Sequence, residues 1–224
     1  MTPAPSDTTP PLGGRVKRIM DLAIAVPMTI LLAPVMIVIA IMVRRDSPGP
    51  AIFRQTRAGL NGKDFQVLKF RTMVDGAERM GSGLAVDAGD DRITPLGATL
   101  RRLSLDELPQ LINVIRGDMS IVGPRPTVPS QLAHYTPEQR GRLTARPGLT
   151  GLAQVRGRAA LPWSERIAID LEYIRDWSVI GDLMIMLRTV VVLVRPADTY
   201  RGETGGFDLP PRDADDEETP PSPK

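Results

Sequence analysis

Cysteine is absent from this sequence of 224 residues, and histidine occurs once, as His134. The chain therefore forms no disulfide, has no thiolate nucleophile and holds no zinc through cysteine. A single histidine also argues against a Ser-His-Asp triad or a multi-histidine metal centre, and we expect no catalytic role for His134. Chemistry falls to Asp, Glu, Lys, Arg, Ser or Thr, and the metal that suits such side chains is a hard, oxygen-bound ion, above all Mg²⁺.

Aromatic residues are also scarce, at 4% of the chain. So few rings offer little platform for stacking bases, and we expect no nucleic-acid partner. The overall charge of +2 conceals an asymmetry, because the last 24 residues hold 3 basic and 7 acidic side chains. The remaining 25 basic and 19 acidic side chains give the rest of the chain a net charge of +6. Such a body attracts phosphate groups, in nucleotides or in anionic lipid.

One long apolar segment runs from Ile19 to Val43, with Asp21 as its only charge. As a straight helix it would extend about 37 Å, enough to cross a bilayer. However, Pro27 and Pro34 each remove a backbone donor inside the segment, and basic residues flank both of its ends, whereas a spanning helix favours a one-sided distribution. Both a spanning helix and a helix that breaks near Pro34 and returns to the same face are compatible with this pattern.

The remaining chain predicts a mainly α-helical protein with a small β-hairpin, an α+β fold. Asn61-Gly62 separates two segments of β character, Ala51–Thr56 and Phe65–Met73, which favours a hairpin. Periodicity predicts helices over 100–115 and 163–176. The apolar run over 182–194 is too short to span a membrane and is expected to form a core or interfacial helix. A short helix capped by Thr136 is also expected. The stretch RGDMSIVGPRPTVP is expected to form an irregular loop. Both ends of the chain, 1–14 and 197–224, are expected to be disordered.

Two adjacent carboxylates, Asp106 and Glu107, stand out in the segment RRLSLDELPQL. Ser104 followed by Glu107 fits a capping box, a purely structural role. Pro109 favours Asp106 as the cap instead, since its missing donor is then harmless. Either arrangement places the carboxylates at a helix N-terminus, which keeps them ionised. A helix cap is the simpler interpretation of this segment alone, and a nucleophile with its helper is the alternative.

Basic residues supply what a catalytic pair would need. An ionised aspartate can attack phosphorus covalently when cations neutralise the phosphate oxygens. Several arginines lie in the Gly/Pro-rich loops VGPRP, ARPGLTG and QVRGR, whose amide groups suit anions. The candidates are Lys69, Arg71, Arg101, Arg102, Arg125, Arg146, Arg156 and Arg158. With an apolar segment in the same chain, a lipid that carries phosphate fits better than nucleic acid.

Several motifs, in order along the chain from Lys17 to Val194, resemble those of the bacterial sugar transferases. They are KRIMDL, LAPVMI, GPAIFRQTRAGLNGKDFQVLKFRTM, LRRLSLDELPQLINVIRGDMSIVGPRP, RPGLTGLAQVRGR and DLEYIRDWS. More narrowly, the chain resembles the small monotopic phosphoglycosyl transferases that begin lipid-linked glycan assembly. Relatives break their membrane helix at a Ser-Pro pair, whereas this chain has Ala33-Pro34, which keeps the proline but loses the hydroxyl.

The resemblance implies transfer of a sugar 1-phosphate from a UDP-sugar to polyprenyl (undecaprenyl) phosphate, with release of UMP and with help from Mg²⁺. Asp106 would attack the β-phosphate, giving a phosphosugar–aspartyl intermediate, and would contact the metal. Glu107 would assist with the acceptor's proton or with the metal. Arg125 and Arg158 match arginines that bind donor phosphates, Lys69 and Arg101 match basic positions near the active site, and Arg146 joins them as a phosphate-binding candidate.

The resemblance also favours a re-entrant membrane helix, broken at Pro34, that leaves the protein on the cytoplasmic face of the bacterial inner membrane. The expected organisation is a disordered N-terminus (1–14), a re-entrant helix (15–45), a cytoplasmic phosphoglycosyl transferase domain with interfacial amphipathic helices (46–196) and a disordered acidic tail (197–224). Membrane lipids would be partners, and a homodimer is compatible with this organisation. Two alternatives stay open: an enzyme in which Asp106 only holds Mg²⁺, and a catalytically silent protein of the membrane surface.

Overall fold

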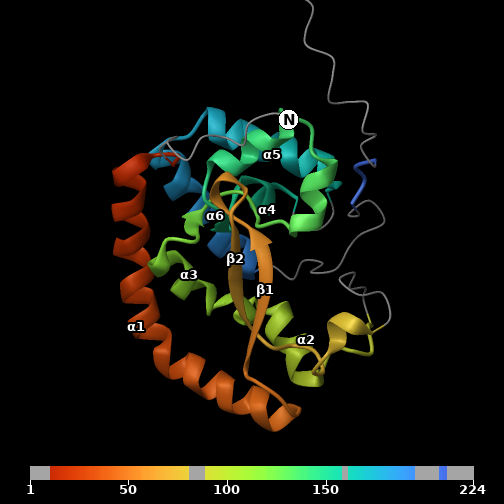
Figure 1. The fold of residues 1–224 in the computed structure, drawn as a ribbon. Coiled ribbons are helices and arrows are strands. Elements are labelled where there is room, and N and C mark those ends of the chain that lie inside the picture. Colours follow the sequence, from red (N-terminus) through yellow and green to blue (C-terminus); the bar gives the residue numbers. More distant parts are fainter. Residues whose placement is uncertain (1–10, 81–88, 158–160, 195–206, 211–224) are drawn as a thin grey trace, which may run out of the picture.

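The structure, a computed structural model, describes residues 11–80, 89–157, 161–194 and 207–210 (Figure 1). It is mostly helical with two small sheets among these residues, which confirms the predicted mainly helical fold. The helices are α1 (Gly14–Asp46), α2 (Pro95–Arg102), α3 (Gln110–Arg116), α4 (Leu152–Arg156), α5 (Trp163–Arg175) and α6 (Val179–Val194). The strands are β1 (Ile52–Ala58), β2 (Asp64–Phe70), β3 (Ser120–Val122) and β4 (Gly148–Thr150).

The predicted hairpin is confirmed as the antiparallel pair of β1 and β2, which are paired over their full length. At its turn, Asn61 and Gly62 have positive φ angles of 55° and 76°. Asparagine and glycine tolerate this left-handed conformation better than other residues. The hairpin carries Arg57 on β1 and Lys69 on β2.

The helix expected over 100–115 is divided in two. α2 ends at Arg102, and the chain turns at Ser104, whose φ is 55°. A 3₁₀ turn, η3 (Leu105–Glu107), then leads through Pro109 into α3. Neither Ser104 nor Asp106 caps a helix with its side chain, so both capping predictions are wrong. Pro109 lies between the 3₁₀ turn and α3, where a residue without a backbone donor costs little.

The other predicted helices are confirmed, with adjusted bounds. The helices expected over 163–176 and 182–194 are α5 and α6, and α6 begins three residues early. Thr136 Oγ1 accepts from the Gln139 backbone nitrogen at 3.2 Å, and Gln139 Oε1 accepts from the Thr136 nitrogen at 3.0 Å. These reciprocal bonds close the turn that leads into η5 (Gln139–Thr144), a 3₁₀ helix whose N-cap residue is Glu138 and not Thr136.

The stretch expected to be an irregular loop contains a strand. β3 pairs in parallel with β4, and each strand has only three residues, too few for a periodic signal. Glycines allow the loop after β3 to touch the segment that leads into β4. A Cβ atom on Gly123 would collide with the Arg146 carbonyl oxygen, and one on Gly148 would collide with the Gly123 backbone. This contact fixes the course of the loop that carries Arg125.

Among the described residues, α1 is the one helix that is long and apolar enough to cross a membrane. In Figure 1 it runs along one edge of the molecule and bends before it reaches β1. Pro27 and Pro34 both lie inside it, and each leaves a carbonyl of the preceding turn without its helical donor, which is a common cause of bending. The expected break is therefore a bend, because the helix is continuous through Pro34.

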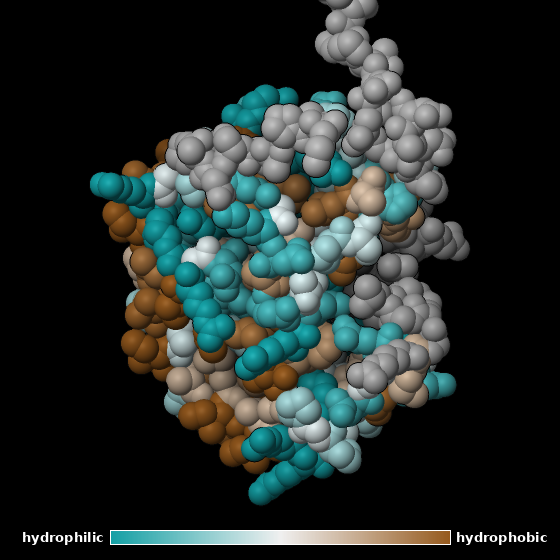
Figure 2. Space-filling view, in the orientation of Figure 1, coloured by the Kyte–Doolittle hydropathy of each residue, from teal (hydrophilic) through white to brown (hydrophobic). Residues whose placement is uncertain are grey.

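α1 buries side chains fully only towards its two ends, while Leu32 and Met36 between them are half-buried against the core clusters. Its buried residues are Lys17, Asp21, Ala25, Ile39 and Val43, so none lies between Val26 and Val38. In this middle part, Ile30 and Leu31 are 71% and 76% exposed. Figure 2 shows hydrophobic side chains gathered along the edge of the molecule where α1 runs. An apolar surface of this extent on one helix is typical of a membrane-facing segment.

Buried charges fix the N-terminal end of α1. Lys17 Nζ donates to Asp182 Oδ2 of α6 at 2.6 Å, and the two side chains are 5% and 0% exposed. The Tyr173 hydroxyl and Trp177 Nε1 donate to the same carboxylate at 2.8 and 3.1 Å. One turn further along α1, Asp21 accepts two hydrogen bonds from β3, each of 2.9 Å. These contacts join α1 to α6 and to β3.

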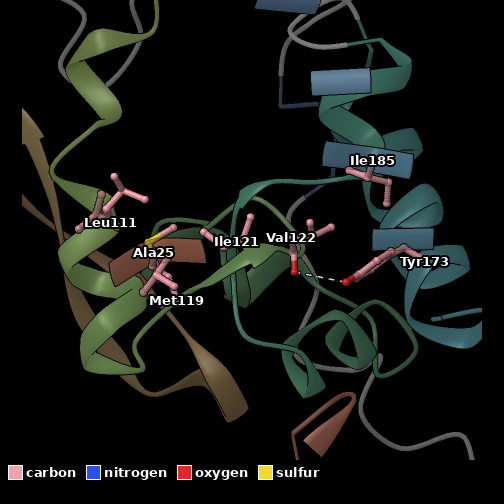
Figure 3. Close-up of a cluster of buried hydrophobic side chains, with 9 residues drawn as sticks. Ala25, Leu111, Met119, Ile121, Val122, Tyr173 and Ile185 are labelled. Carbon is pink, nitrogen blue, oxygen red and sulfur yellow. Dashed lines mark hydrogen bonds between the residues drawn. The ribbon is translucent and has the colours of Figure 1, made fainter. Parts of the chain in front are cut away.

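Two apolar clusters form the core. The larger consists of Ala25, Val67, Leu111, Val114, Met119, Ile121, Val122, Tyr173 and Ile185. Figure 3 shows Ala25 of α1 next to Leu111 and Met119, while the Tyr173 hydroxyl donates to the Val122 carbonyl at the other end of the cluster. The smaller cluster consists of Ile39, Val43, Phe70 and Leu100. Both ends of α1 therefore pack on the same folded domain.

A short piece of the C-terminal tail, residues 207–210, packs on this domain. The ring of Phe207 lies edge-on to His134, with 5.2 Å between ring centroids. Asp208 accepts hydrogen bonds from the nitrogen and hydroxyl of Ser164 at 2.9 and 2.6 Å, at the first turn of α5. This part of the tail is thus not the solvated extension that was expected. The other residues predicted to be disordered lie largely outside the described ranges.

Asparagine in place of Asp182 should destabilise the protein strongly. The substitution keeps the shape of the side chain but leaves the buried Lys17 without its counterion. Loss of one partner from a buried pair typically costs about 3–5 kcal/mol. Denaturant unfolding of the full chain in lipid nanodiscs measures the change. The matched control is Arg175→Gln, which removes an exposed ion pair and should have little effect. Equal stability of Asp182→Asn and wild type would refute the anchoring role.

Candidate active site

A cleft of about 470 Å³ opens beside the two adjacent carboxylates. Its lining combines two kinds of surface. Its charged lining includes Arg101, Asp106, Glu107 and Arg125, together with Arg142, Arg166 and Asp170. Apolar side chains come from α1 and α6, namely Ile24, Met28, Met186, Val190 and Leu193. Since Met28, Val190 and Leu193 are also 40–60% exposed, the apolar wall continues into the exposed hydrophobic surface of both helices.

Asp106 lies on η3 and is only 8% exposed. Its carboxylate lines the cleft and makes no hydrogen bond or ion pair with any residue that the structure describes. Burial raises the pKa of Asp106 above its ordinary value, the positive charge of Lys69 opposes this, and the negative charge of Glu107 adds to it. Asp106 is therefore a desolvated carboxylate whose oxygens are available to a ligand in the cleft.

Glu107, by contrast, is held by two cations. Its Oε1 accepts from Lys69 Nζ at 2.8 Å and from Arg125 Nη2 at 3.0 Å. Burial alone would raise the pKa of Glu107, but the charges and hydrogen bonds of Lys69 and Arg125 outweigh burial and hold this pKa well below its usual range. The three side chains come from η3, β2 and the loop after β3, so this contact brings distant parts of the chain together. Glu107 remains an anion under ordinary conditions.

Arg101, also predicted as a site residue, lies at the end of α2. It lines the cleft, and its Nε donates to Thr72 Oγ1 at 2.8 Å. Its positive charge lowers the pKa of Asp106. The structure thus brings together five of the predicted residues: Lys69, Arg101, Asp106, Glu107 and Arg125.

The sequence analysis missed Arg57, which the hairpin brings close to this group. Lys69 pairs with Phe53 across the hairpin, and alternation along β1 places Arg57 on the same face. Its Nη1 lies 3.4 Å from the carbonyl of the residue after Arg125. Burial, and then the charge of Arg125, lower the pKa of Arg57 to about 10. An anion bound between the two guanidinium groups would relieve their repulsion. The hairpin register could have identified this residue.

The sequence analysis also missed Arg142, a buried residue that hydrogen-bonds the backbone of the loop that carries Arg125. It is 2% exposed, and its Nη2 donates to the Arg125 carbonyl at 3.0 Å. Its Nη1 donates to the Tyr135 hydroxyl at 2.7 Å, and it forms a buried ion pair with Asp170. Because these bonds fix the Arg125 backbone, Arg142 positions the side chain that binds Glu107. No local pattern in the sequence distinguishes it from a surface arginine.

Other predicted residues lie elsewhere. Arg146 donates from Nε to the Gly117 carbonyl at 2.9 Å and lies near Arg18 and Asp21 of α1, so the structure does not bring it to the carboxylates. Arg158 lies outside the described residues. Of the remaining candidates, Arg71 bonds the carbonyls of Val43, Ser47 and Pro48 at the end of α1, and Arg156 forms an exposed pair with Glu172.

Asp106 is the residue at the cleft that is suited to bind Mg²⁺. The described part of the chain contains no group of three or more His, Cys, Asp or Glu side chains that could hold a metal by itself. Magnesium is usually bound through one or two carboxylates together with substrate phosphates. The Asp106 carboxylate, which has no protein partner, offers such a ligand. Glu107 is less suitable, because its Oε1 is already shared by two cations.

A desolvated carboxylate beside clustered cations, in a cleft with an apolar wall, suits group transfer at a phosphate that is attached to a lipid. Comparison with known proteins agrees, since a model of the bacterial sugar transferase family matches residues 13–196. The chain belongs to this family, and it is an enzyme of the transferase class.

Individual relatives are similar over most of the chain. The UDP-glucose:undecaprenyl-phosphate glucose-1-phosphate transferase of Caulobacter vibrioides is 48% identical over 193 residues, which cover 82% of this chain and 72% of the relative. The exopolysaccharide production protein ExoY of Sinorhizobium fredii is 38% identical over 204 residues, covering 85% and 90%. The undecaprenyl-phosphate galactose phosphotransferase of Salmonella typhimurium is 37% identical over 198 residues, covering 82% of this chain but 41% of the relative.

Replacing the two carboxylates by amides should change stability in opposite directions. A raised pKa means that ionised Asp106 is less favourable in the folded than in the unfolded protein. Asp106→Asn should therefore increase the free energy of unfolding at pH 7, by about 1 kcal/mol. The lowered pKa of Glu107 has the reverse meaning, so Glu107→Gln should decrease it. Thermal unfolding of the three proteins in nanodiscs measures both changes.

The pH dependence provides a check. The gain from Asp106→Asn should shrink as the pH falls through the raised pKa of Asp106, because the wild type then loses its buried charge. The contribution of Glu107 is present above the ordinary pKa of glutamate and is lost on acidification towards its lowered pKa. An Asp106→Asn protein that is less stable than wild type at pH 7 would mean that this carboxylate has a structural role.

Proposed function

We propose that this protein transfers a sugar 1-phosphate from a UDP-sugar to undecaprenyl phosphate and releases UMP, as a first membrane step of exopolysaccharide or related glycan assembly. The names of its relatives support this, since they include glucose and galactose phosphotransferases that act on undecaprenyl phosphate and an exopolysaccharide production protein. The observation that carries the proposal is the buried Asp106 carboxylate, which faces the cleft without a protein partner while Glu107 binds two cations.

In the first step Asp106 acts as the nucleophile. One carboxylate oxygen attacks the β-phosphorus of the donor, and the bond from that phosphorus to the bridging oxygen breaks. UMP leaves with the electron pair, and the phosphosugar remains on Asp106 as an acyl phosphate. Burial favours this attack, because a desolvated carboxylate does not have to shed water, while Lys69 and Arg101 counteract its protonation.

In the second step an oxygen of undecaprenyl phosphate attacks the same phosphorus. The bond to Asp106 breaks, the carboxylate is restored, and the product is a lipid diphosphate sugar. The second pKa of a phosphate monoester is about 6, so most of the acceptor is already deprotonated at neutral pH and needs no base. Glu107 is therefore not needed as a base, and its lowered pKa makes it a poor proton acceptor. Its role is to hold Lys69 and Arg125 where they contact the donor.

The donor diphosphate binds among the cations that surround the two carboxylates. Arg125 and Lys69 meet at Glu107, Arg101 lines the cleft, and Arg57 faces Arg125. The positive charge of these side chains exceeds the two negative charges of Asp106 and Glu107, so the site can neutralise a diphosphate anion. A Mg²⁺ ion held by Asp106 and the diphosphate would supply further neutralisation of charge on the departing UMP.

The acceptor's isoprenoid chain lies along the apolar wall that α1 and α6 contribute to the cleft. This wall continues into exposed residues of both helices, so a lipid can pass from the membrane to Asp106 without crossing a polar barrier. The phosphate of the acceptor then approaches the same cations as the donor.

The membrane arrangement we propose is re-entrant, with the enzyme on the cytoplasmic face of the inner membrane. α1 has no buried residue between Val26 and Val38, but Ala25 on one side and Ile39 on the other pack on the same domain. A helix that crossed the roughly 30 Å hydrocarbon core would place its two ends on opposite sides. A helix bent at its prolines returns both ends to one side, where UDP-sugars are made.

Asp106→Asn should abolish transfer, with a loss of at least about 10³-fold in kcat, since removal of a nucleophile leaves only binding effects. UMP release is measured from the full chain in nanodiscs with undecaprenyl phosphate, Mg²⁺ and each of several UDP-sugars. With donor alone, labelled in its sugar phosphate, the wild type should become labelled on Asp106. Asp64→Asn, at an exposed position of the hairpin, is the matched control and should remain active.

Two results would contradict parts of this mechanism. Activity retained in Asp106→Asn, or turnover without any labelled protein, would favour direct transfer in which Asp106 only binds Mg²⁺. Absence of UMP release from every UDP-sugar would instead favour a catalytically silent protein of the membrane surface.

Labelling of introduced cysteines tests the topology, because the chain has none of its own. Ser6→Cys and Ser47→Cys, made separately, flank α1, and Ser130→Cys reports the side of the exposed catalytic domain. In sealed inverted vesicles, an impermeant maleimide should label all three positions from the cytoplasmic side. Labelling of Ser6→Cys and Ser47→Cys from opposite sides would establish a spanning helix.

A further inference from the structure

Gln154, on α4, contributes to the wall of the cleft and carries an unusual polar group. Both polar atoms of its side-chain amide, Oε1 and Nε2, are buried and have no hydrogen-bond partner among the described residues. The same side chain lines the cleft that contains Asp106. None of the steps proposed above uses it.

The surroundings of Gln154 explain why the amide is left without partners. Three residues near it in sequence that also line the cleft, Leu149, Ala153 and Val155, are apolar. Oε1 lies close to Gly151, where an added Cβ would come within 2.5 Å of it and would also collide with the Gly123 carbonyl oxygen. The amide is therefore placed at the contact between the β4–α4 connection and the loop that leads, two residues later, to Arg125.

An unpaired buried amide is costly, because both its donor and its acceptor have lost water without replacement. An apolar side chain of the same length would fill this space at lower cost. Arrangements of this kind are found at functional sites, where a ligand supplies the missing hydrogen bonds. The cleft at which the amide lies is the proposed substrate site.

The chemistry of the amide indicates which chemical groups of a substrate it can bind. A carboxamide is neutral and offers a donor and an acceptor side by side. The isoprenoid chain of the acceptor has no hydrogen-bonding group, and the phosphates are matched by the cations near Glu107. The neutral polar groups that remain belong to the donor: the hydroxyls of its sugar and the imide edge of its uracil.

We propose that the Gln154 side-chain amide hydrogen-bonds a neutral donor–acceptor pair of the UDP-sugar, and so makes Gln154 a residue that recognises the donor. This inference rests on the proposed function. The sugar hydroxyls and the uracil edge present the same hydrogen-bonding chemistry, and they can be told apart by ligands that lack the sugar.

The test uses Gln154→Met, which keeps the length of the side chain and removes its polar atoms. Binding of UDP-glucose, UDP-galactose and UDP is measured by calorimetry on the full chain in nanodiscs, in an Asp106→Asn background that prevents turnover. UDP-sugar binding should weaken by roughly 10-fold or more, as for the loss of one or two hydrogen bonds. The melting temperature should stay the same or rise, because a costly buried amide has been removed. A purely structural glutamine predicts the opposite, a lower melting temperature.

Gln66→Met, which removes an exposed glutamine on β2, is the matched control and should leave binding unchanged. Weaker binding of UDP-sugars with unchanged binding of UDP assigns Gln154 to the sugar, and an equal loss for both assigns it to the uridine. Unchanged binding of both ligands, or a lower melting temperature, overturns the inference while the proposed function stands. If the wild-type protein, which keeps Asp106, binds no UDP-sugar at all, the proposed function fails and the inference fails with it.

Discussion

Lys69 and Arg125 share one oxygen of Glu107, and the geometry of the site depends on this contact. It joins the hairpin, the turn before α3 and the loop after β3, three parts of the chain that are distant in sequence. Because Glu107 takes up the two cations, the neighbouring Asp106 keeps its carboxylate without a protein partner. Adjacent carboxylates thus acquire different properties, one with a lowered and one with a raised pKa. The same principle separates the roles of paired carboxylates in many enzymes.

The apolar helix α1 and the candidate active site are parts of one structure. Lys17 and Asp182 connect α1 to α6 through a buried ion pair, and both helices contribute to the apolar wall of the cleft. The two prolines let α1 bend, so that Ile39 and Val43 return to the domain on which Ala25 also packs. The transfer that we propose, from a polar donor to a membrane lipid, needs such continuity, since the two substrates come from different solvents.

The site retains features that a merely stable fold would avoid. Asp106 is a desolvated carboxylate, and the amide of Gln154 is buried without a hydrogen bond. Arg57 and Arg125 bring two guanidinium groups close to each other. Each arrangement costs folding free energy in the absence of a ligand, and in the proposed function it would be relieved by a phosphate, a metal or a polar group of the donor. The least favourable polar groups of the protein are therefore informative about its ligands.

The sequence by itself determined the elements whose signals are local. Asn61-Gly62 predicted the hairpin, an amphipathic pattern predicted α5, an apolar run predicted α6, and the motif around Asp106 and Glu107 indicated a candidate catalytic pair. Only the tertiary structure decided that Ser104 divides the expected helix, that β3 and β4 pair in parallel, and that Arg146 lies away from the carboxylates. It also identified Arg57, Arg142 and Gln154. The physical reason is that charge, burial and a missing hydrogen bond depend on neighbours far away in sequence, whereas turns and helical periodicity depend on residues a few positions apart.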